Sequence, residues 1–268
     1  MLALLRLVRI HAAATAAALA LLGARLAASP TEPVTLVLVA VTVALATAGG
    51  NALNDVHDRE IDAVNRADRP IPSGAIGVIP ATVTAVASLL LAILGAALLS
   101  PWCLAICLVN CGLLAAYARF SKRLGAAKSV IVGGLVGSAV LYGAVRPERV
   151  TLAMTALAAC AVLATVAREI VKDVEDIAGD RAAGARTLPI VIGARRSRRI
   201  ADAALVLAVA VAFVPLLAGI VNDRYLPGVL LGGAVLGIAM ATRDPGRAQR
   251  LVMAGSVIEM AAFYLGTT

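Results

Sequence analysis

Apolar runs of about twenty residues recur along the whole chain of 268 residues, and they restrict its fold more than any other feature. A helix of that length crosses the roughly 30 Å of hydrocarbon in a bilayer. The chain is 61% hydrophobic and has a mean hydropathy of +0.93, far above the range of soluble domains. The runs do not alternate with a period of two, so the spans are predicted to be helices. The sequence therefore predicts an all-α, polytopic membrane protein.

Turn residues divide the apolar runs into nine predicted transmembrane helices. Ser29-Pro30, Ser100-Pro101 and Asp244-Pro245-Gly246 are typical of breaks between helices, because proline cannot continue the helical hydrogen-bond ladder. The predicted helices, with approximate bounds, cover residues 9–28, 34–56, 78–99, 101–120, 128–145, 150–172, 199–220, 226–242 and 248–266.

The basic residues predict the orientation of these helices. When the helix ends are grouped into two sides, 20 of the 24 Lys and Arg residues fall on the side that holds the N-terminus. Cytoplasmic loops carry such an excess. We therefore expect a multi-pass protein of the plasma membrane, with the N-terminus and the active-site loops in the cytoplasm. The net charge of +8 then reflects loops at an anionic bilayer surface, and no nucleic-acid partner is expected.

Three aspartates follow the second apolar run, in the stretch NALNDVHDREIDAVNRADRPIP that begins at Asn51. Asp55, Asp58 and Asp62 have the spacing i, i+3, i+7, which predicts one shared helix face that also carries Asn51 and Asn54. Carboxylates that face one way repel one another unless a cation lies between them. Hard oxygen ligands suit Mg²⁺, which commonly binds a few carboxylates together with substrate phosphates.

The same spacing returns at Asp173, Asp176 and Asp180, each 118 residues after its counterpart. The second stretch ends the sixth predicted helix, four helices after the first, and an even number of spans preserves orientation. The sequence therefore predicts two parallel four-helix halves, roughly 9–127 and 128–242, with a ninth helix at 248–266, in one domain of residues 1–268 around a central cavity.

Two acidic faces that converge on one cavity predict binding of a diphosphate. Six carboxylates can hold two or more Mg²⁺ ions, and a diphosphate is a good leaving group when metal ions and basic side chains neutralise it. Apolar helix walls suit a polyprenyl tail, and ionisation then gives an allylic cation. Tyr117 is either an interface aromatic or part of the cavity wall. The basic residues in reach of the phosphates are Arg66, Arg69, Lys122, Lys128 and Arg181.

At these two motifs the sequence resembles the UbiA superfamily of intramembrane prenyltransferases. The pattern NDxxDxxxD is present from Asn54 to Asp62, and DxxDxxxD from Asp173 to Asp180. The flanks NRADRPIPSG and REIVKDVEDIAGDRAAGARTLP are most similar to the digeranylgeranylglyceryl phosphate synthase subgroup and its bacterial relatives.

The resemblance implies a nine-helix bundle around a cavity. It also implies Mg²⁺-dependent transfer of an isoprenyl group, with geranylgeranyl diphosphate favoured as donor, to a lipophilic acceptor. In that family's pattern the six aspartates and Asn54 would serve the metal–diphosphate site, with Asn51 one turn away on the same helix wall. Arg66, Arg69 and Lys122 would serve the phosphates.

Two other functions stay open at this point. A terpene cyclase on the same scaffold would quench the cation with its own double bonds and need no acceptor. The chain has only three Phe, four Tyr and one Trp to stabilise such a cation, which favours transfer. An ion or lipid-phosphate transporter is the second alternative. It is disfavoured because a transport site lies near the midplane, whereas both acidic stretches are predicted on one membrane side.

Overall fold

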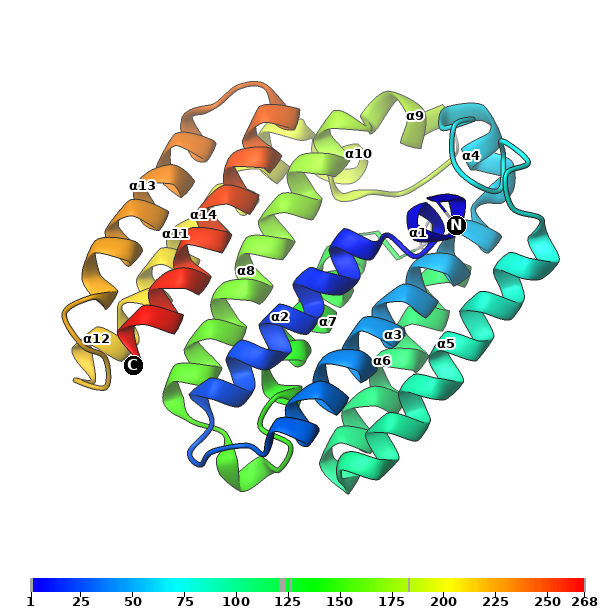
Figure 1. Ribbon diagram of the computed structural model, residues 1–268. Coiled ribbons are helices and arrows are strands. Elements are labelled where there is room, and N and C mark those ends of the chain that lie inside the picture. The colour runs from blue at the N-terminus through cyan, green and yellow to red at the C-terminus, as the bar shows by residue number, and fades with distance from the viewer. Residues whose placement is uncertain (1, 121–123, 126, 183, 268) are drawn as a thin grey trace.

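The long helices of the computed structural model lie side by side in one tilted bundle (Figure 1). The structure describes residues 2–120, 124–125, 127–182 and 184–267. Within these residues one long helix overlaps each predicted helix range, so the all-α prediction is confirmed. These helices are α2 (Ile10–Leu26), α3 (Pro33–His57), α5 (Val78–Leu99), α6 (Pro101–Phe120), α7 (Ala127–Tyr142), α8 (Leu152–Glu175), α11 (Ala194–Ala212), α13 (Tyr225–Ala241) and α14 (Pro245–Gly266).

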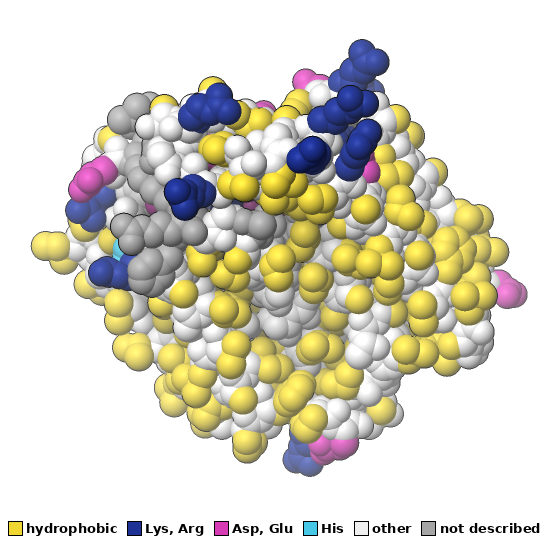
Figure 2. All heavy atoms as spheres, turned by 180° about the vertical axis from the view of Figure 1, so that it is seen from behind, with side chains coloured by type: hydrophobic (Ala, Val, Ile, Leu, Met, Phe, Trp, Pro, Cys, Tyr) yellow, Lys and Arg dark blue, Asp and Glu magenta, His cyan; other side chains and the backbone are white. Residues whose placement is uncertain are grey.

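In the described part of the chain, five helical segments are long and apolar enough to cross a membrane, which confirms a polytopic chain. They are α3, α5, α6 up to Arg119, α8, and the segment Ala194–Leu217 that joins α11 to α12 (Val214–Leu217). The helices α2, α7 and α13 are apolar but shorter. Large apolar side chains cover the outside, for example Leu98 at 70% exposed, and Figure 2 shows them as a broad band. The count of nine spans stays a prediction.

The break between α5 and α6 has the predicted local cause. Ser100 is extended, with φ −175° and ψ 162°, and its hydroxyl accepts a hydrogen bond from the Cys103 amide at 3.1 Å. Serine is a preferred helix N-cap, and Pro101 suits the first helical position because its missing N–H has no partner there. The prediction of two separate helices is confirmed.

Glycines allow α2 and α7 to pack with their backbones in close contact. A Cβ atom at Gly23 would stand 2.0 Å from the carbonyl oxygen of Val140, and a Cβ at Gly143 would stand 2.1 Å from that of Ala20. Small residues permit such close helix packing in membranes. Because α2 otherwise packs on α3, and α7 on α8, this contact joins the first part of the chain to the second.

We expect Gly23→Ala to destabilise the protein by about 1–3 kcal/mol, because backbone atoms must move to admit the methyl group. Thermal unfolding in detergent measures the effect. Gly237→Ala is the matched control, since a Cβ there meets nothing within 4 Å. Equal melting temperatures for the two variants would contradict the close α2–α7 contact.

Four short helices gather at one end of the bundle, where Figure 1 also places the N-terminus. They are α1 (Leu2–Leu7), α4 (Arg59–Asn65), α9 (Ile177–Ala182) and α10 (Leu188–Ile192). The opposite end holds α12, the 3₁₀ helix η1 (Pro147–Arg149) and the C-terminus. Most of the Lys and Arg side chains visible in Figure 2 lie towards the first end. The sequence predicted none of these short elements.

Candidate active site

The first cluster consists of Asp55, Asp58 and Asp62, at the end of the bundle that carries the short helices. The helix α3 ends at His57 and α4 begins at Arg59, with Asp58 between them at φ −86° and ψ 2°. The expectation that a single helix carries all three aspartates is therefore corrected. The helical backbone hydrogen bonds nevertheless continue across the break. The Asp58 amide donates to the Asn54 carbonyl, and the Asp62 amide donates to the Asp58 carbonyl. The chain thus keeps the three side chains near one face.

Arg69 holds two members of the first cluster together. Its Nη1 atom donates to Asp55 Oδ1 at 3.3 Å and also to Asp62 Oδ2. Asp55 is 3% exposed and Asp62 is 6% exposed, so this guanidinium neutralises two buried carboxylates. Asn54 donates to Asp58 Oδ2 at 2.9 Å. Burial raises the pKa of the Asp58 carboxyl above its usual value, and the charge of Asp62 raises this pKa further.

Arg9 is a contact of this cluster that the sequence did not predict. Its Nη2 atom lies 2.7 Å from Asp55 Oδ1. The residue sits between α1 and α2 in the left-handed backbone region, at φ 47°, which is uncommon for a side chain other than glycine. In the sequence, an arginine before an apolar run is typical of a cytoplasmic anchor. Only the fold brings it to a partner 46 positions away.

The second cluster consists of Asp173, Asp176 and Asp180, and its backbone repeats that of the first. The helix α8 ends at Glu175 and α9 begins at Ile177, with Asp176 between them at φ −88° and ψ 5°. Asp176 therefore has almost the same backbone as Asp58, at the constant offset of the two motifs. The motif thus encodes a local break at its second aspartate in both places.

Among the described residues, fewer basic side chains contact the second cluster than the first. Asp173 is 1% exposed, and its Oδ1 atom accepts a bond from Lys128 Nζ at 2.6 Å. Its Oδ2 atom is buried without a hydrogen-bond partner among the described residues, as is the Oδ2 atom of Asp180. Buried polar atoms are normally satisfied. These two oxygens are therefore available to a cation.

Tyr117 interacts electrostatically with both clusters. The phenol of this α6 residue is within electrostatic range of Asp58 in the first cluster and of Asp173 and Lys128 at the second. Such interactions extend only over a limited distance in a protein. Both acidic clusters therefore border the same region of the bundle, and the interpretation of Tyr117 as a wall residue is favoured over that of an interface aromatic.

The other predicted site residues are less closely involved. Asn51 donates to the Val8 carbonyl at 3.3 Å and so ties α3 to the N-terminal segment. Arg66 and Arg181 are exposed and form no side-chain hydrogen bond or ion pair within the described residues. Lys122 lies outside the residues that the structure describes.

The donor set fits a hard divalent cation such as Mg²⁺. In the described part of the chain, no three His, Cys, Asp or Glu side chains already form a group that would hold a metal ion. The buried carboxylates instead take positive charge from Arg9, Arg69 and Lys128. The unpaired oxygens of Asp173 and Asp180 are the ligand type that Mg²⁺ prefers.

A bundle of apolar helices whose buried aspartates converge at one end has the architecture of an intramembrane enzyme for a charged substrate with an apolar tail. The chain belongs to the UbiA prenyltransferase family. The sequence profile of that family matches residues 13–258. This range includes both clusters. The family expected from the two motifs is therefore confirmed.

Relatives and solved structures resemble the chain over almost its whole length. The digeranylgeranylglyceryl phosphate synthase of Natronomonas pharaonis is 42% identical over 268 residues, which cover 98% of this chain and 96% of the relative. A solved structure of a digeranylgeranylglyceryl phosphate synthase in membranes is 29% identical, with a TM-score of 0.81, covering 99% of this chain and 97% of that one. A UbiA homologue from Archaeoglobus fulgidus, bound to GPP and Mg²⁺, is 18% identical, with a TM-score of 0.72 and 98% coverage of both chains.

Proposed function

We propose that this prenyltransferase transfers a geranylgeranyl group from geranylgeranyl diphosphate to the free glycerol hydroxyl of geranylgeranylglyceryl phosphate. The observation that carries the proposal is the pair of buried aspartate clusters that repeat one backbone break and border one region. The choice of substrates is supported by the 42% identity to a digeranylgeranylglyceryl phosphate synthase over nearly the whole chain.

We further propose that two or more Mg²⁺ ions bind between the clusters. The carboxylates of Asp55, Asp58, Asp62, Asp173, Asp176 and Asp180 would hold them, as the buried, unpaired oxygens of the second cluster suggest. When bound, Mg²⁺ would neutralise the negative charge that develops on the departing diphosphate. The GPP and Mg²⁺ bound by the Archaeoglobus homologue support this assignment.

The protein's own residues bind and orient the substrates. Arg69 and Lys128, which already lie on the clusters, would donate to phosphate oxygens, together with Arg66, Lys122 and Arg181. The bond between C1 of the prenyl group and oxygen breaks, and its electron pair leaves with the diphosphate. The acceptor hydroxyl then forms the new bond to C1, and its proton passes to the departed diphosphate. Tyr117 offers an aromatic face to the allylic cation.

The orientation belongs to the same proposal. We place the end with α1, α4 and α9 at the cytoplasmic face of the plasma membrane. The support is the excess of basic side chains at that end (Figure 2).

One incubation tests the proposal. Purified protein, Mg²⁺ and geranylgeranyl diphosphate are mixed with and without geranylgeranylglyceryl phosphate, and the products are identified by mass spectrometry. We expect digeranylgeranylglyceryl phosphate only when the acceptor is present. A cyclic hydrocarbon made without acceptor would overturn transfer in favour of cyclisation. Absence of diphosphate release under both conditions would overturn both enzymatic functions.

A further inference from the structure

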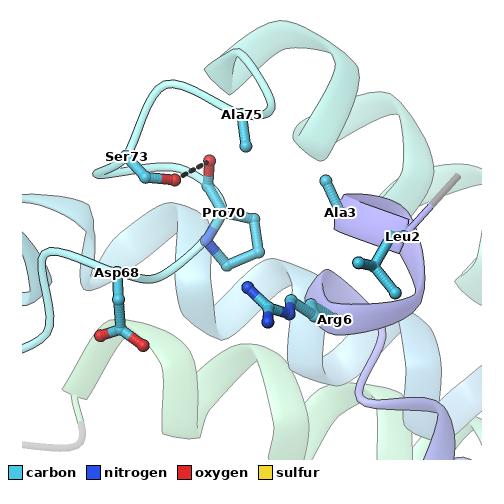
Figure 3. A pocket seen from close by; sticks show the side chains of 7 residues that line it. All are labelled: Leu2, Ala3, Arg6, Asp68, Pro70, Ser73 and Ala75. Carbon is cyan, nitrogen blue, oxygen red and sulfur yellow. Dashed lines mark hydrogen bonds between the residues drawn. The ribbon is translucent and has the colours of Figure 1, made fainter.

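A pocket of about 270 Å³ lies beside the first cluster, between α1 and the segment that follows α4. Figure 3 shows Arg6 and the apolar side chains of α1 on one side, and Pro70 with its neighbours on the other. The polar lining groups are Arg6, Asp68 and Ser73. A volume at the lower limit of small-molecule sites suits a headgroup rather than a whole prenyl chain.

Arg6 is the positive group of this pocket. Its guanidinium is drawn inside the pocket, next to the ring of Pro70 (Figure 3). Its side chain forms no hydrogen bond or ion pair with any residue that the structure describes, and Asp68 at the rim is likewise unpaired within that part of the chain. A guanidinium with five free donors is a group that recognises phosphate by paired hydrogen bonds.

Both walls of the pocket are connected in sequence to contacts of the first cluster. Arg6 lies three positions before Arg9, and Pro70 directly follows Arg69. Arg9 and Arg69 both contact Asp55. A headgroup in the pocket is therefore bound by the two chain segments that also contact Asp55.

The helix α1, which forms one wall of the pocket, also exposes apolar side chains. Leu2 and Leu4 of α1 are 68% and 43% exposed, whereas Leu7 is buried against α3 and α5. Exposed leucines on a short helix at the charged end of a membrane bundle are suited to the interface between headgroups and acyl chains. A lipid in that layer would have its phosphate near α1, the helix that carries Arg6.

We propose that this pocket binds the phosphate group of the lipid acceptor, with Arg6 as its phosphate-binding residue. The inference rests on the proposed function, which supplies an acceptor that carries a phosphate monoester. Arg6 thereby distinguishes this acceptor from the same lipid without its phosphate, and directs the glycerol hydroxyl toward the first cluster.

The test compares geranylgeranylglyceryl phosphate with geranylgeranylglycerol, which lacks the phosphate. We expect Arg6→Gln to raise the KM for the phosphate acceptor about tenfold, the loss of one charge-assisted contact. The KM for geranylgeranyl diphosphate should change less than about twofold, and the preference for the phosphate acceptor should largely disappear. Asp68→Asn should lower the acceptor KM about twofold, because it removes a like charge. Arg199→Gln, an exposed arginine of α11, is the matched control.

Equilibrium binding of the same two lipids to the protein gives a second readout that needs no turnover. If the protein binds the phosphate lipid more strongly than the other lipid, and Arg6→Gln removes this difference, the inference is supported. This holds even if no transfer is observed. Absence of transfer would overturn only the proposed function. Transfer with an unchanged acceptor KM in Arg6→Gln would overturn the inference alone. An effect that appears in vesicles with anionic phospholipid and vanishes in neutral vesicles would also overturn it, because Arg6 would then bind bilayer headgroups.

Discussion

We expect Asp173→Asn to lower turnover by at least about 10³-fold while the protein still assembles. The substitution removes the charge of the least exposed aspartate of the second cluster, 1% exposed, and replaces a carboxylate oxygen that has no other partner among the described residues. In the proposed function this charge would hold Mg²⁺ against the departing diphosphate, so its loss would remove several kcal/mol of transition-state stabilisation. Release of diphosphate in a single-turnover experiment measures the effect, and size-exclusion chromatography in detergent checks assembly.

Two further variants separate catalysis from burial of charge. Asp202→Asn makes the same chemical change in α11, where Asp202 pairs with Arg198 at 3.0 Å outside the clusters, and it should leave turnover within about twofold. Asp173→Asn with Lys128→Met removes both partners of the buried ion pair, so stability should recover relative to Asp173→Asn alone. Turnover should stay low. Normal turnover in folded Asp173→Asn would remove the second cluster from the active site.

Features encoded by local sequence were predictable. The apolar runs fix where long helices form, and Ser100-Pro101 fixes one break because both residues act within a single turn. The repeated aspartate spacing is enough to locate both clusters along the chain. It does not reveal that Asp58 and Asp176 each sit between two helices, because the spacing i, i+3, i+7 is the same for one helix and for two that follow almost without interruption.

Contacts between distant residues were not predictable. Arg9 meets Asp55 across 46 positions, and in the sequence it has only the role of a basic residue before an apolar run. Lys128 was predicted near the phosphates, but its contact with Asp173, 45 positions away, was not. The helix α1 is only six residues long, too short for a clear periodic pattern, and yet it forms one wall of the Arg6 pocket.

Arg69→Ala is expected to have the second largest effect, on stability and on turnover together. Without this guanidinium, Asp55 and Asp62 remain buried at 3% and 6% exposure with like charges facing each other. Breaking such a buried pair costs about 3–5 kcal/mol. We therefore expect Arg69→Ala to unfold at a lower temperature than the unsubstituted protein when both are measured in buffer that contains a chelator. Turnover should fall about 100-fold, because a cation for the diphosphate is also lost.

Addition of Mg²⁺ distinguishes the two roles of Arg69. A divalent cation between the carboxylates replaces the missing positive charge, so Mg²⁺ should restore most of the unfolding temperature of Arg69→Ala. It should not restore turnover, because the phosphate contact stays absent, and the KM for the prenyl diphosphate should stay high. Arg59→Ala is the control, since Arg59 is 44% exposed and pairs with exposed Glu60 at 3.2 Å, and it should alter neither quantity appreciably. Full recovery of turnover with Mg²⁺ would assign Arg69 to charge neutralisation alone, whereas no recovery of stability would argue against a metal site in the first cluster.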